Sequence, residues 1–483
     1  MSDDTPSAPR RRVDASSAST AGSADVLGAL RGALGDRVTT DPDALEAARR
    51  DRSGHAAAER PLAVVRAASI DDVRATMRIA SETTTPVVTQ GALTGLAGAA
   101  NAGGGEIALS VADMTRILDV SPDDQLAVVE PGILNAALNE HLATHGLWWA
   151  PDPASREIST VGGNIATGAG GLLCAKYGVT RDAVLGVDVV LADGSLVRMG
   201  HRSVKGVTGL DLTSLMIGSE GTLGVIVGAT LKLRRTVPGD VCTLTAMFPS
   251  VREAAAASSA VTASGVEPAI MELMDHASLS AACGVLGLDA PTSGASQLTI
   301  QTDGPAATAE AESIADILRR RASEVRVTRD RAEGEELLRI RRAMHPGMAS
   351  LGTTLIEDVS VPRSRMAEMF DEIARVERDH GVRIPTVAHA GDGNLHPNFI
   401  FDGEEVPPGI WEAADDLFRA AIRLGGTLTG EHGIGVLKSR WLADELGEKQ
   451  WQLQRDIKNV FDPQGLLNPG KVFAPRDELL QHP

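Results

Sequence analysis

Residues 159–171 read Ser-Thr-Val-Gly-Gly-Asn-Ile-Ala-Thr-Gly-Ala-Gly-Gly, a run with almost no side-chain bulk. Such a run offers little apolar area to bury, so it is poorly suited to building a hydrophobic core. Where side chains are small, backbone N–H groups can approach an anion or a large flat ligand closely. We therefore predict that this stretch is a loop lying against a bound cofactor.

Three further small-residue segments lie nearby, at residues 90–99, 205–209 and 217–226. A single glycine-rich turn is more often a plain connection between elements. None of the segments is a GxGxxG motif opening a long helix or a GxxxxGK[ST] motif, so neither a Rossmann site nor a P-loop fits. Four such loops within about 140 residues, each placed after a predicted strand, converge better on one extended cofactor than on four unrelated turns.

Composition excludes several classes of protein. The 483 residues suffice for two or three domains, and 43% apolar with 23% charged residues is ordinary for a soluble globular protein. A net charge of −18 argues against nucleic-acid binding, which needs a basic face. The three cysteines form no CxxC, which excludes a cysteine-ligated Fe–S cluster within this chain and favours a reducing compartment.

The N-terminal 24 residues are rich in Ser, Ala, Asp and Pro, and no apolar segment follows their three arginines. We expect residues 1–24 to be a disordered tail rather than a secretory signal. No run of about eighteen uncharged apolar residues occurs, so a transmembrane helix is not expected. We expect a cytoplasmic protein, with peripheral attachment to a membrane left open.

From about residue 238 the pattern changes to alternating strands and helices, which predicts an α+β layer with an antiparallel sheet. Strands are predicted at 241–248, 269–274, 297–301, 325–328, 354–361, 384–390 and 395–401, and helices at 251–264, 306–321, 364–380, 408–424 and 438–460.

A second informative stretch is residues 386–401, Thr-Val-Ala-His-Ala-Gly-Asp-Gly-Asn-Leu-His-Pro-Asn-Phe-Ile-Phe. Its Gly-Asp-Gly-Asn turn between apolar runs predicts a β-hairpin that brings His389 and His396 together. Residues 430–435, Gly-Glu-His-Gly-Ile-Gly, add Glu431 and His432. Two histidines and a carboxylate suit a divalent zinc, iron or manganese ion, and the third histidine would then serve as a base. The alternative is that these are unrelated core and turn residues.

These blocks, together with KGVTGLDL, IGSEGTLGVI, EDVSVP and DPQGLLNPGK, resemble one family in their order along the chain. The chain resembles the vanillyl-alcohol oxidase/PCMH superfamily, in the branch of FAD-linked D-lactate dehydrogenases and the FAD subunit of glycolate oxidase. The resemblance runs from about residue 55 to 473. It implies an α+β fold with a two-subdomain PCMH-type FAD-binding domain at 25–237, a substrate-binding cap with an antiparallel sheet at 238–425, and a C-terminal segment at 426–475 that returns to the FAD domain.

The resemblance also implies which residues bind FAD: Gly91, Thr94, Gly95, Leu96, Ala97, Gly98, Pro131, Gly132, Thr160, Val161, Gly162, Gly163, Asn164, Gly168, Tyr177, Glu220, Gly221, Ile226 and Asn468. Relatives often carry Arg-Gly-Gly-Gly-Thr-Gly in the first loop, whereas residues 90–95 here are Gln-Gly-Ala-Leu-Thr-Gly and lack the arginine. No histidine occurs in that loop or at 160–171, the places from which relatives attach flavin covalently. We therefore expect non-covalent FAD.

The implied reaction is oxidation of a D-2-hydroxy acid, D-lactate-like or glycolate, to the 2-keto acid with hydride transfer to flavin N5. A metal that touches the hydroxyl oxygen lowers its pKa, and a neutral histidine accepts the proton. We assign His389, His396 and Glu431 as ligands of zinc or manganese and His432 as the base. Without a metal, the same residues would hydrogen-bond the substrate directly.

The segment Arg339 to Pro346 carries three arginines on a predicted helix, a pattern that usually marks a solvated face. In an acidic protein that oxidises hydroxy acids, Arg341 becomes a candidate for bidentate capture of the substrate carboxylate. His345 lies four residues later, on the same face of a continuous helix, where we expect it to shape the choice of substrate side chain.

Several competing functions and partners stay open. One alternative is a flavin transferase like alkyl-glycerone-phosphate synthase, and another is the FAD subunit of a multi-subunit glycolate oxidase. An NAD-linked dehydrogenase is disfavoured because no dinucleotide fingerprint is present. The oxidase interpretation requires an external electron acceptor, such as a quinone, a cytochrome or an electron-transfer flavoprotein, and allows a homodimer.

Overall fold

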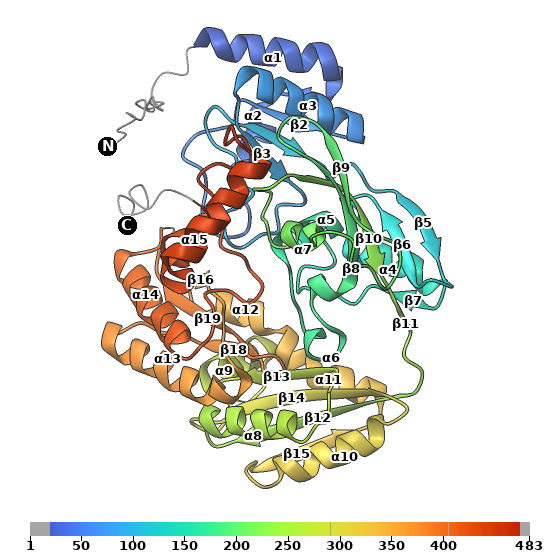
Figure 1. Ribbon diagram of the computed structural model, residues 1–483. Helices are drawn as coiled ribbons and strands as arrows, with labels where there is room; N and C mark the ends of the chain where they lie inside the picture. Colours follow the sequence, from blue (N-terminus) through green and yellow to red (C-terminus); the bar gives the residue numbers. More distant parts are fainter. Residues whose placement is uncertain (1–19, 290, 404, 474–483) are drawn as a thin grey trace, which may run out of the picture.

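Three main β-sheets organise the described chain, which in this computed structural model comprises residues 20–289, 291–403 and 405–473 (Figure 1). A four-stranded and a five-stranded sheet lie in the N-terminal half, and an eight-stranded antiparallel sheet lies in the C-terminal half. A small ribbon pairs β7 (Leu147–Trp148) with β11 (Arg234–Arg235). Helices and antiparallel sheets together confirm the α+β class.

The first sheet has the strand order β1-β2-β4-β3, and both β2 and β3 run parallel to β4. Its helix α3 begins where the Ser69 hydroxyl accepts a hydrogen bond from the Asp72 N–H, which caps the helix. Helices α1 and α3 bury Leu30 and Met77 in one core with the sheet. The elements here are α1 (Thr20–Leu34), η1 (Gly35–Arg37), β1 (Val38–Thr39), α2 (Pro42–Ala47), β2 (Ala63–Arg66), α3 (Ile70–Thr83), β3 (Val87–Gln90) and β4 (Ile107–Ser110).

The second sheet has the order β5-β6-β10-β8-β9 and is antiparallel throughout. The Asp193-Gly194 sequence, typical of a tight hairpin turn, joins the paired strands β8 and β9, and Gly194 takes a φ of +79° in the turn. The elements are β5 (Ile117–Ser121), β6 (Leu126–Val129), α4 (Asn135–Ala143), α5 (Val161–Thr167), α6 (Cys174–Tyr177), η2 (Thr180–Ala183), β8 (Val184–Val190), β9 (Leu196–Gly200), α7 (Leu212–Met216) and β10 (Val225–Lys232).

Two expectations for the N-terminal half need correction. Residues 161–167 are not a loop but the short helix α5, which the Thr160 hydroxyl caps by accepting the Gly163 N–H at 3.2 Å. Small residues do not prevent helix formation, and Val161 and Ile165 supply enough apolar area to join the core beneath the second sheet. The predicted tail falls largely on residues 1–19, outside the described residues, but α1 already includes residues 20–24.

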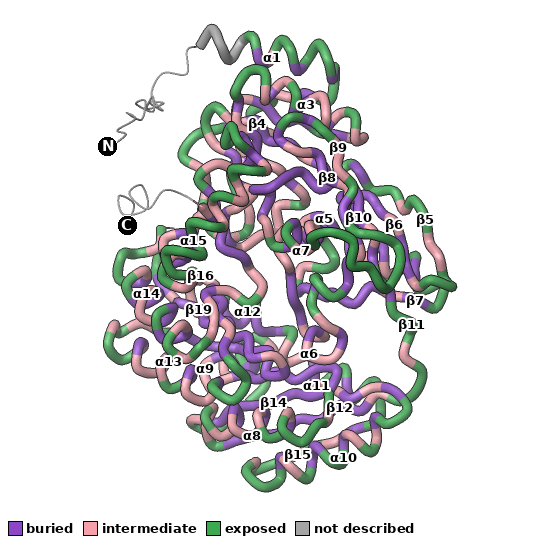
Figure 2. Tube along the Cα trace, in the orientation of Figure 1, coloured by how far each residue is buried: buried purple, intermediate pink, exposed green. Residues whose placement is uncertain are grey.

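The C-terminal sheet has the order β15-β12-β14-β13-β18-β19-β16, with β17 paired to β19. Its inner strands are mostly buried, whereas the edge strands β15 and β16 are partly exposed (Figure 2). The elements are β12 (Asp240–Phe248), α8 (Val251–Ala263), β13 (Ile270–Met274), α9 (His276–Leu286), β14 (Ser296–Gly304), α10 (Ala307–Leu318), β15 (Glu324–Thr328), α11 (Arg331–Arg342), α12 (Met344–Ala349), β16 (Thr353–Ile356), β17 (Val359–Ser360), η3 (Arg363–Arg365), α13 (Met366–His380), β18 (Thr386–His389), β19 (Asn394–Phe401), α14 (Pro408–Arg423), η4 (Ser439–Trp441) and α15 (Leu442–Phe461).

The predicted hairpin at 386–401 is confirmed as β18 and β19. His389 pairs with Asn394 across the turn, and Val387 pairs with His396. Because strand residues two apart share a face, His396 projects on the same side as Asn394 and lies diagonally opposite His389. The two imidazole centroids are 5.0 Å apart.

The end of the chain returns to the first sheet. Leu467 forms a parallel bridge with Val87, and α15 runs from the C-terminal sheet toward β3 (Figure 1). The helix predicted at 438–460 corresponds to η4 and α15, and Gly447, with a φ of +70°, breaks the helical geometry inside α15. Of the helices in the described chain, none is both long and apolar enough to cross a membrane.

A substitution at Phe399 tests whether the hydrophobic core of the C-terminal half is packed as described. Its side chain is fully buried on β19 against the helices, so Phe399→Ala should destabilise the fold by about 3–5 kcal/mol through lost burial and a new cavity. Chemical denaturation of the variant and of Val460→Ala, an exposed control, measures the difference. An equal unfolding free energy for both variants would contradict this placement of the core.

Candidate active site

One large cavity, about 670 Å³ in volume, lies between the two halves of the chain. Its walls combine the segment after β3, the residues around α5, the turn before β10 and the C-terminal segment. A volume of this size is typical of ligand-binding clefts. The predicted cofactor residues that line it are Gly91, Thr94, Gly95, Leu96, Ala97, Pro131, Thr160, Gly162, Gly163, Asn164, Glu220, Gly221, Ile226 and Asn468.

Five residues predicted to bind the cofactor do not line this cavity: Gly98, Gly132, Val161, Gly168 and Tyr177. Val161 is fully buried in the core of the second sheet, and Gly168 ends α5 with a φ of +68°. The Tyr177 hydroxyl donates to Asp303 on β14, so this side chain links the two halves of the chain instead of facing the cavity.

The cavity walls fit a large cofactor held by backbone contacts. Gly91 has no room for a side chain, because a Cβ there would lie 2.6 Å from the Thr160 hydroxyl. Two buried polar atoms of lining residues, Thr89 Oγ1 and Asn164 Nδ2, have no hydrogen-bond partner among the described residues. Buried polar groups are normally satisfied, so these two atoms fit contacts to a ligand.

Sequence reasoning missed one wall of the cavity. Asp51 and Arg52 line it beside the first small-residue loop: the Asp51 carboxylate accepts the Gly98 N–H at 2.9 Å, and the Arg52 N–H donates to the Gly95 carbonyl at 2.9 Å. Arg52 thus supplies an arginine next to a loop that carries none of its own. These residues precede the loop by about forty positions, and no local pattern links them to it.

Asn468 connects three segments of the cavity wall. Its side-chain NH₂ donates to the carbonyls of Ala99 at 3.2 Å and Glu220 at 2.7 Å. Its side-chain carbonyl accepts the Thr89 N–H at 3.1 Å. One buried amide therefore holds the strand end, the first loop and the turn before β10 in a fixed relation.

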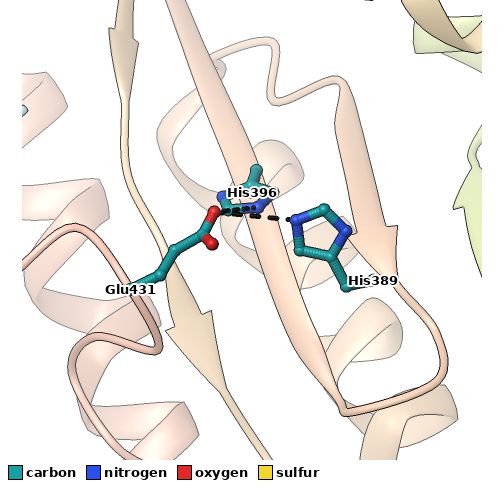
Figure 3. A group of neighbouring side chains, drawn as sticks. All are labelled: His389, His396 and Glu431. Atoms are coloured by element: carbon teal, nitrogen blue, oxygen red, sulfur yellow. Dashed lines mark ion pairs between the residues drawn. The ribbon is translucent and has the colours of Figure 1, made fainter. Parts of the chain in front are cut away.

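The histidines and carboxylate predicted as metal ligands come together (Figure 3). Glu431 Oε1 lies 3.2 Å from His396 Nε2 and 3.6 Å from His389 Nε2. His432 stacks on His396 with ring centroids 5.1 Å apart, and its Nε2 lies 3.8 Å from the same carboxylate oxygen. Glu431 and His432 also line the cavity, so the cluster opens onto the cofactor-sized space.

The loop at 430–435 is held by buried carboxylates from both halves of the chain. Asp358 Oδ2 accepts the N–H groups of Gly430 at 2.6 Å and Glu431 at 2.8 Å. Glu220 accepts the N–H groups of Ile434 at 2.7 Å and Gly435 at 2.8 Å. Asp358 therefore holds the loop in place, and this attachment determines where Glu431 and His432 lie.

Burial shifts the proton affinities of this loop and its anchors. Burial lowers the pKa of His432 to about 4, although the nearby Asp358 carboxylate acts in the opposite direction. Burial raises the pKa of Glu220 to about 7 against the effect of its backbone hydrogen bonds. His432 is therefore neutral at physiological pH, which is the protonation state required of a base.

Arg341 and His345 do not share one helical face. Helix α11 ends at Arg342 and α12 begins at Met344, so the continuous helix that we predicted is interrupted. His345 lines the cavity, whereas Arg341 Nε and Nη2 both contact Glu272 Oε2 at 2.7 Å. Two of the three guanidinium nitrogens of Arg341, predicted to bind a substrate carboxylate bidentately, therefore already contact Glu272. Only Nη1 remains for a contact with substrate.

The cluster of His389, His396 and Glu431 fits a divalent metal ion. One ligand atom from each residue lies within 4.8 Å of the others. Two ligands on a tetrahedral ion at bond lengths of about 2.0–2.1 Å are about 3.3 Å apart, close to the observed spacings. His396 Nδ1 is buried and has no hydrogen-bond partner among the described residues. Imidazole and carboxylate donors suit zinc or manganese.

A mixed α+β architecture with a backbone-lined cavity and a His/Glu cluster at its wall fits a flavoprotein of the oxidase class, and comparison with known families shows that class. Residues 61–200 match the family described as FAD binding domain, and residues 237–472 match FAD linked oxidases, C-terminal domain.

Relatives and solved structures agree with this class. The glycolate oxidase subunit GlcD of Bacillus subtilis (strain 168) is 37% identical, covering 86% of this chain and 89% of the relative. The D-lactate dehydrogenase of Archaeoglobus fulgidus is 34% identical, covering 85% and 90%. The D-lactate dehydrogenase [cytochrome] of Arabidopsis thaliana is 32% identical, covering 93% and 80%. A structure of p-cresol methylhydroxylase shares the fold with a TM-score of 0.77 at 16% identity, covering 95% of this chain and 98% of that chain.

The chain belongs to the FAD-linked oxidase family, in the branch that contains glycolate oxidase subunit GlcD and the FAD-linked D-lactate dehydrogenases. It is an FAD-linked oxidoreductase, and its fold is that of the PCMH-type FAD-binding proteins.

Asn468→Ala tests the cavity wall. Losing the three hydrogen bonds of the Asn468 side chain, each contributing about 0.5–1.5 kcal/mol, should loosen the cavity wall and weaken FAD binding by about 10-fold or more. Titration of apoprotein with FAD, followed by flavin fluorescence, measures the affinity. Ser81→Ala removes an exposed hydrogen bond to Gln464 and is the control. Equal FAD affinity for the two variants would rule out this role for Asn468.

Proposed function

We propose that the chain oxidises a small D-2-hydroxy acid, D-lactate-like or glycolate, to the corresponding 2-keto acid. The observation that carries the proposal is that one cavity is lined both by the predicted cofactor residues and by Glu431, His432 and His345. A hydroxy acid in this space would contact the cofactor on one side and a proton acceptor on the other. The names of the relatives, glycolate oxidase subunit and D-lactate dehydrogenase, support the same substrate class.

Each residue of the cluster takes one task in this reaction. Bound FAD supplies a hydride acceptor at N5, and a divalent ion supplies positive charge beside the substrate hydroxyl. His389, His396 and Glu431 hold that ion. His432 takes the hydroxyl proton at Nε2, since its Nδ1 faces Asp358 Oδ1 at 3.6 Å.

The two residues from the α11–α12 segment recognise the rest of the substrate. Arg341 attracts the carboxylate through its charge and offers Nη1, while Glu272 holds the remainder of its guanidinium. His345 borders the cavity and limits the size of the substituent on the hydroxy-bearing carbon. Reduced enzyme then passes electrons to an external acceptor, for which we propose a quinone, a cytochrome or an electron-transfer flavoprotein.

A second candidate is the FAD subunit of a multi-subunit glycolate oxidase. The Bacillus subtilis relative, whose name describes such a subunit, favours it. The hydroxy-acid chemistry would be the same, and only the route by which electrons leave would differ. Solved alkyldihydroxyacetonephosphate synthases share the fold with a TM-score of 0.69 at 19% identity, a likeness that concerns the fold alone.

A substrate panel tests the proposal. Anaerobic FAD-loaded protein mixed with D-lactate or glycolate should lose the absorbance of oxidised flavin, whereas L-lactate should act far more slowly. Free FAD mixed with each acid is the control. If dithionite reduces the bound flavin but no 2-hydroxy acid does, the oxidase proposal fails and a transferase without net redox chemistry is favoured.

His432→Ala tests the base. Removing a general base should lower kcat for the preferred acid by about 10²- to 10⁴-fold while FAD stays bound. Steady-state assays with flavin content measured on the same sample separate loss of chemistry from loss of cofactor. His145→Ala, an exposed histidine outside the cavity, is the matched control. A His432→Ala enzyme with near wild-type kcat would refute the assignment.

A further inference from the structure

Glu272 is a buried carboxylate directly behind the metal cluster. It lies on β13, where it is the register partner of His389 on β18, and only 1% of the residue is exposed. Glu272 does not line the cavity. Burying a carboxylate is costly unless both oxygens are paired, so its contacts reveal its role.

The two oxygens of Glu272 have different partners. Oε1 lies 2.7 Å from His389 Nδ1, and Oε2 lies 2.7 Å from the Arg341 guanidinium. One carboxylate thus connects a predicted metal ligand to the predicted substrate-binding arginine. Arg341 pairs the buried negative charge of Glu272 at the oxygen that does not contact His389.

The contact with Oε1 determines how His389 faces the cluster. An ionised carboxylate only accepts hydrogen bonds, and a histidine that binds a metal is neutral, so in the metal-bound protein the proton of His389 lies on Nδ1. The lone pair then lies on Nε2, which faces Glu431 Oε1 at 3.6 Å. The Nδ1 atoms of His396 and His432 have no hydrogen-bond partner among the described residues, so this carboxylate anchor distinguishes His389 from the other two.

We propose that Glu272 is a positioning residue that holds His389 with Nε2 toward the metal and at the same time fixes Arg341 at the edge of the substrate site. The inference rests on the proposed metal-assisted function. Carboxylate partners behind metal-binding histidines typically change metal affinity by about 10- to 100-fold. Because the same carboxylate holds Arg341, its loss also disturbs the recognition of the substrate carboxylate.

The experiment measures metal binding directly. Metal-free, FAD-loaded protein is titrated with Co²⁺, whose absorption spectrum reports the ligands, and Zn²⁺ affinity is then obtained by competition. Glu272→Gln should weaken both ions by about 10- to 100-fold and alter the Co²⁺ spectrum. The amide keeps the shape but lacks the charge, and it can donate to Nδ1 and so favour the wrong ring tautomer.

Asp275→Asn is the matched control. Asp275 follows β13 by one residue, and its carboxylate accepts the N–H groups of Ser278 and Thr386, whereas Glu272 contacts His389. Its loss should lower stability while leaving Co²⁺ affinity and the Co²⁺ spectrum as in the wild type. Equal weakening in both variants would show a general structural effect and overturn the assignment to Glu272.

The remaining outcomes separate this inference from the proposed function. If wild-type protein binds neither Co²⁺ nor Zn²⁺, both the metal-assisted mechanism and this inference are wrong. If the wild type binds metal and Glu272→Gln binds it equally well, the metal site stands and the inference fails. If Glu272→Gln does not fold, ¹⁵N-histidine spectra of the zinc-loaded wild type test the proposal instead, with the His389 signal assigned by comparison with a His389→Gln spectrum. His389 is expected to carry its proton on Nδ1. A proton on Nε2 would overturn the proposal.

Discussion

The site depends on the double attachment of the loop at 430–435. Asp358 from the C-terminal half and Glu220 from the N-terminal half each accept short hydrogen bonds from two consecutive N–H groups of this loop. Gly433 takes a φ of +89° between the two anchors, and a Cβ there would lie 2.9 Å from the Glu220 carboxylate. Moving either half of the chain would therefore displace Glu431 and His432.

Buried charge is the second constraint. Asp358 and Glu357 are both buried, and Lys438, itself 2% exposed, lies 2.6 Å and 3.2 Å from their carboxylates. Burying such a group of charges is costly unless each is paired, so this ion cluster has essentially one satisfactory arrangement. Asp358, a member of this ion cluster, also binds the backbone of the 430–435 loop and so fixes the position of His432. The site is thus held by hydrogen bonds to the backbone of the loop that carries Glu431 and His432.

Local pattern predicted much of the fold from the sequence. The hairpin with His389 and His396, the alternating strands and helices after residue 238, and the Asp193-Gly194 turn all follow from chemistry within a few residues. Local pattern failed where two signals competed. Residues 161–167 have the composition of a loop but carry a capping threonine and two core side chains, and the capped helix formed. The break between α11 and α12 precedes Pro346, which lacks the N–H that a continuous helix needs, and our prediction of one helical face did not use this signal.

By itself, the sequence determined the chemical groups of the site, because small-residue segments and a His-Glu-His set near turns are readable locally. Only the tertiary structure decided which of them meet. Asp51 and Arg52 line the cavity although they are distant in sequence from the first small-residue loop. Tyr177 donates a hydrogen bond to Asp303 in the other half of the chain, and Glu272 pairs with the Arg341 guanidinium. These outcomes depend on register between strands far apart in the chain and on the need to pair every buried charge, and neither can be read from a local pattern.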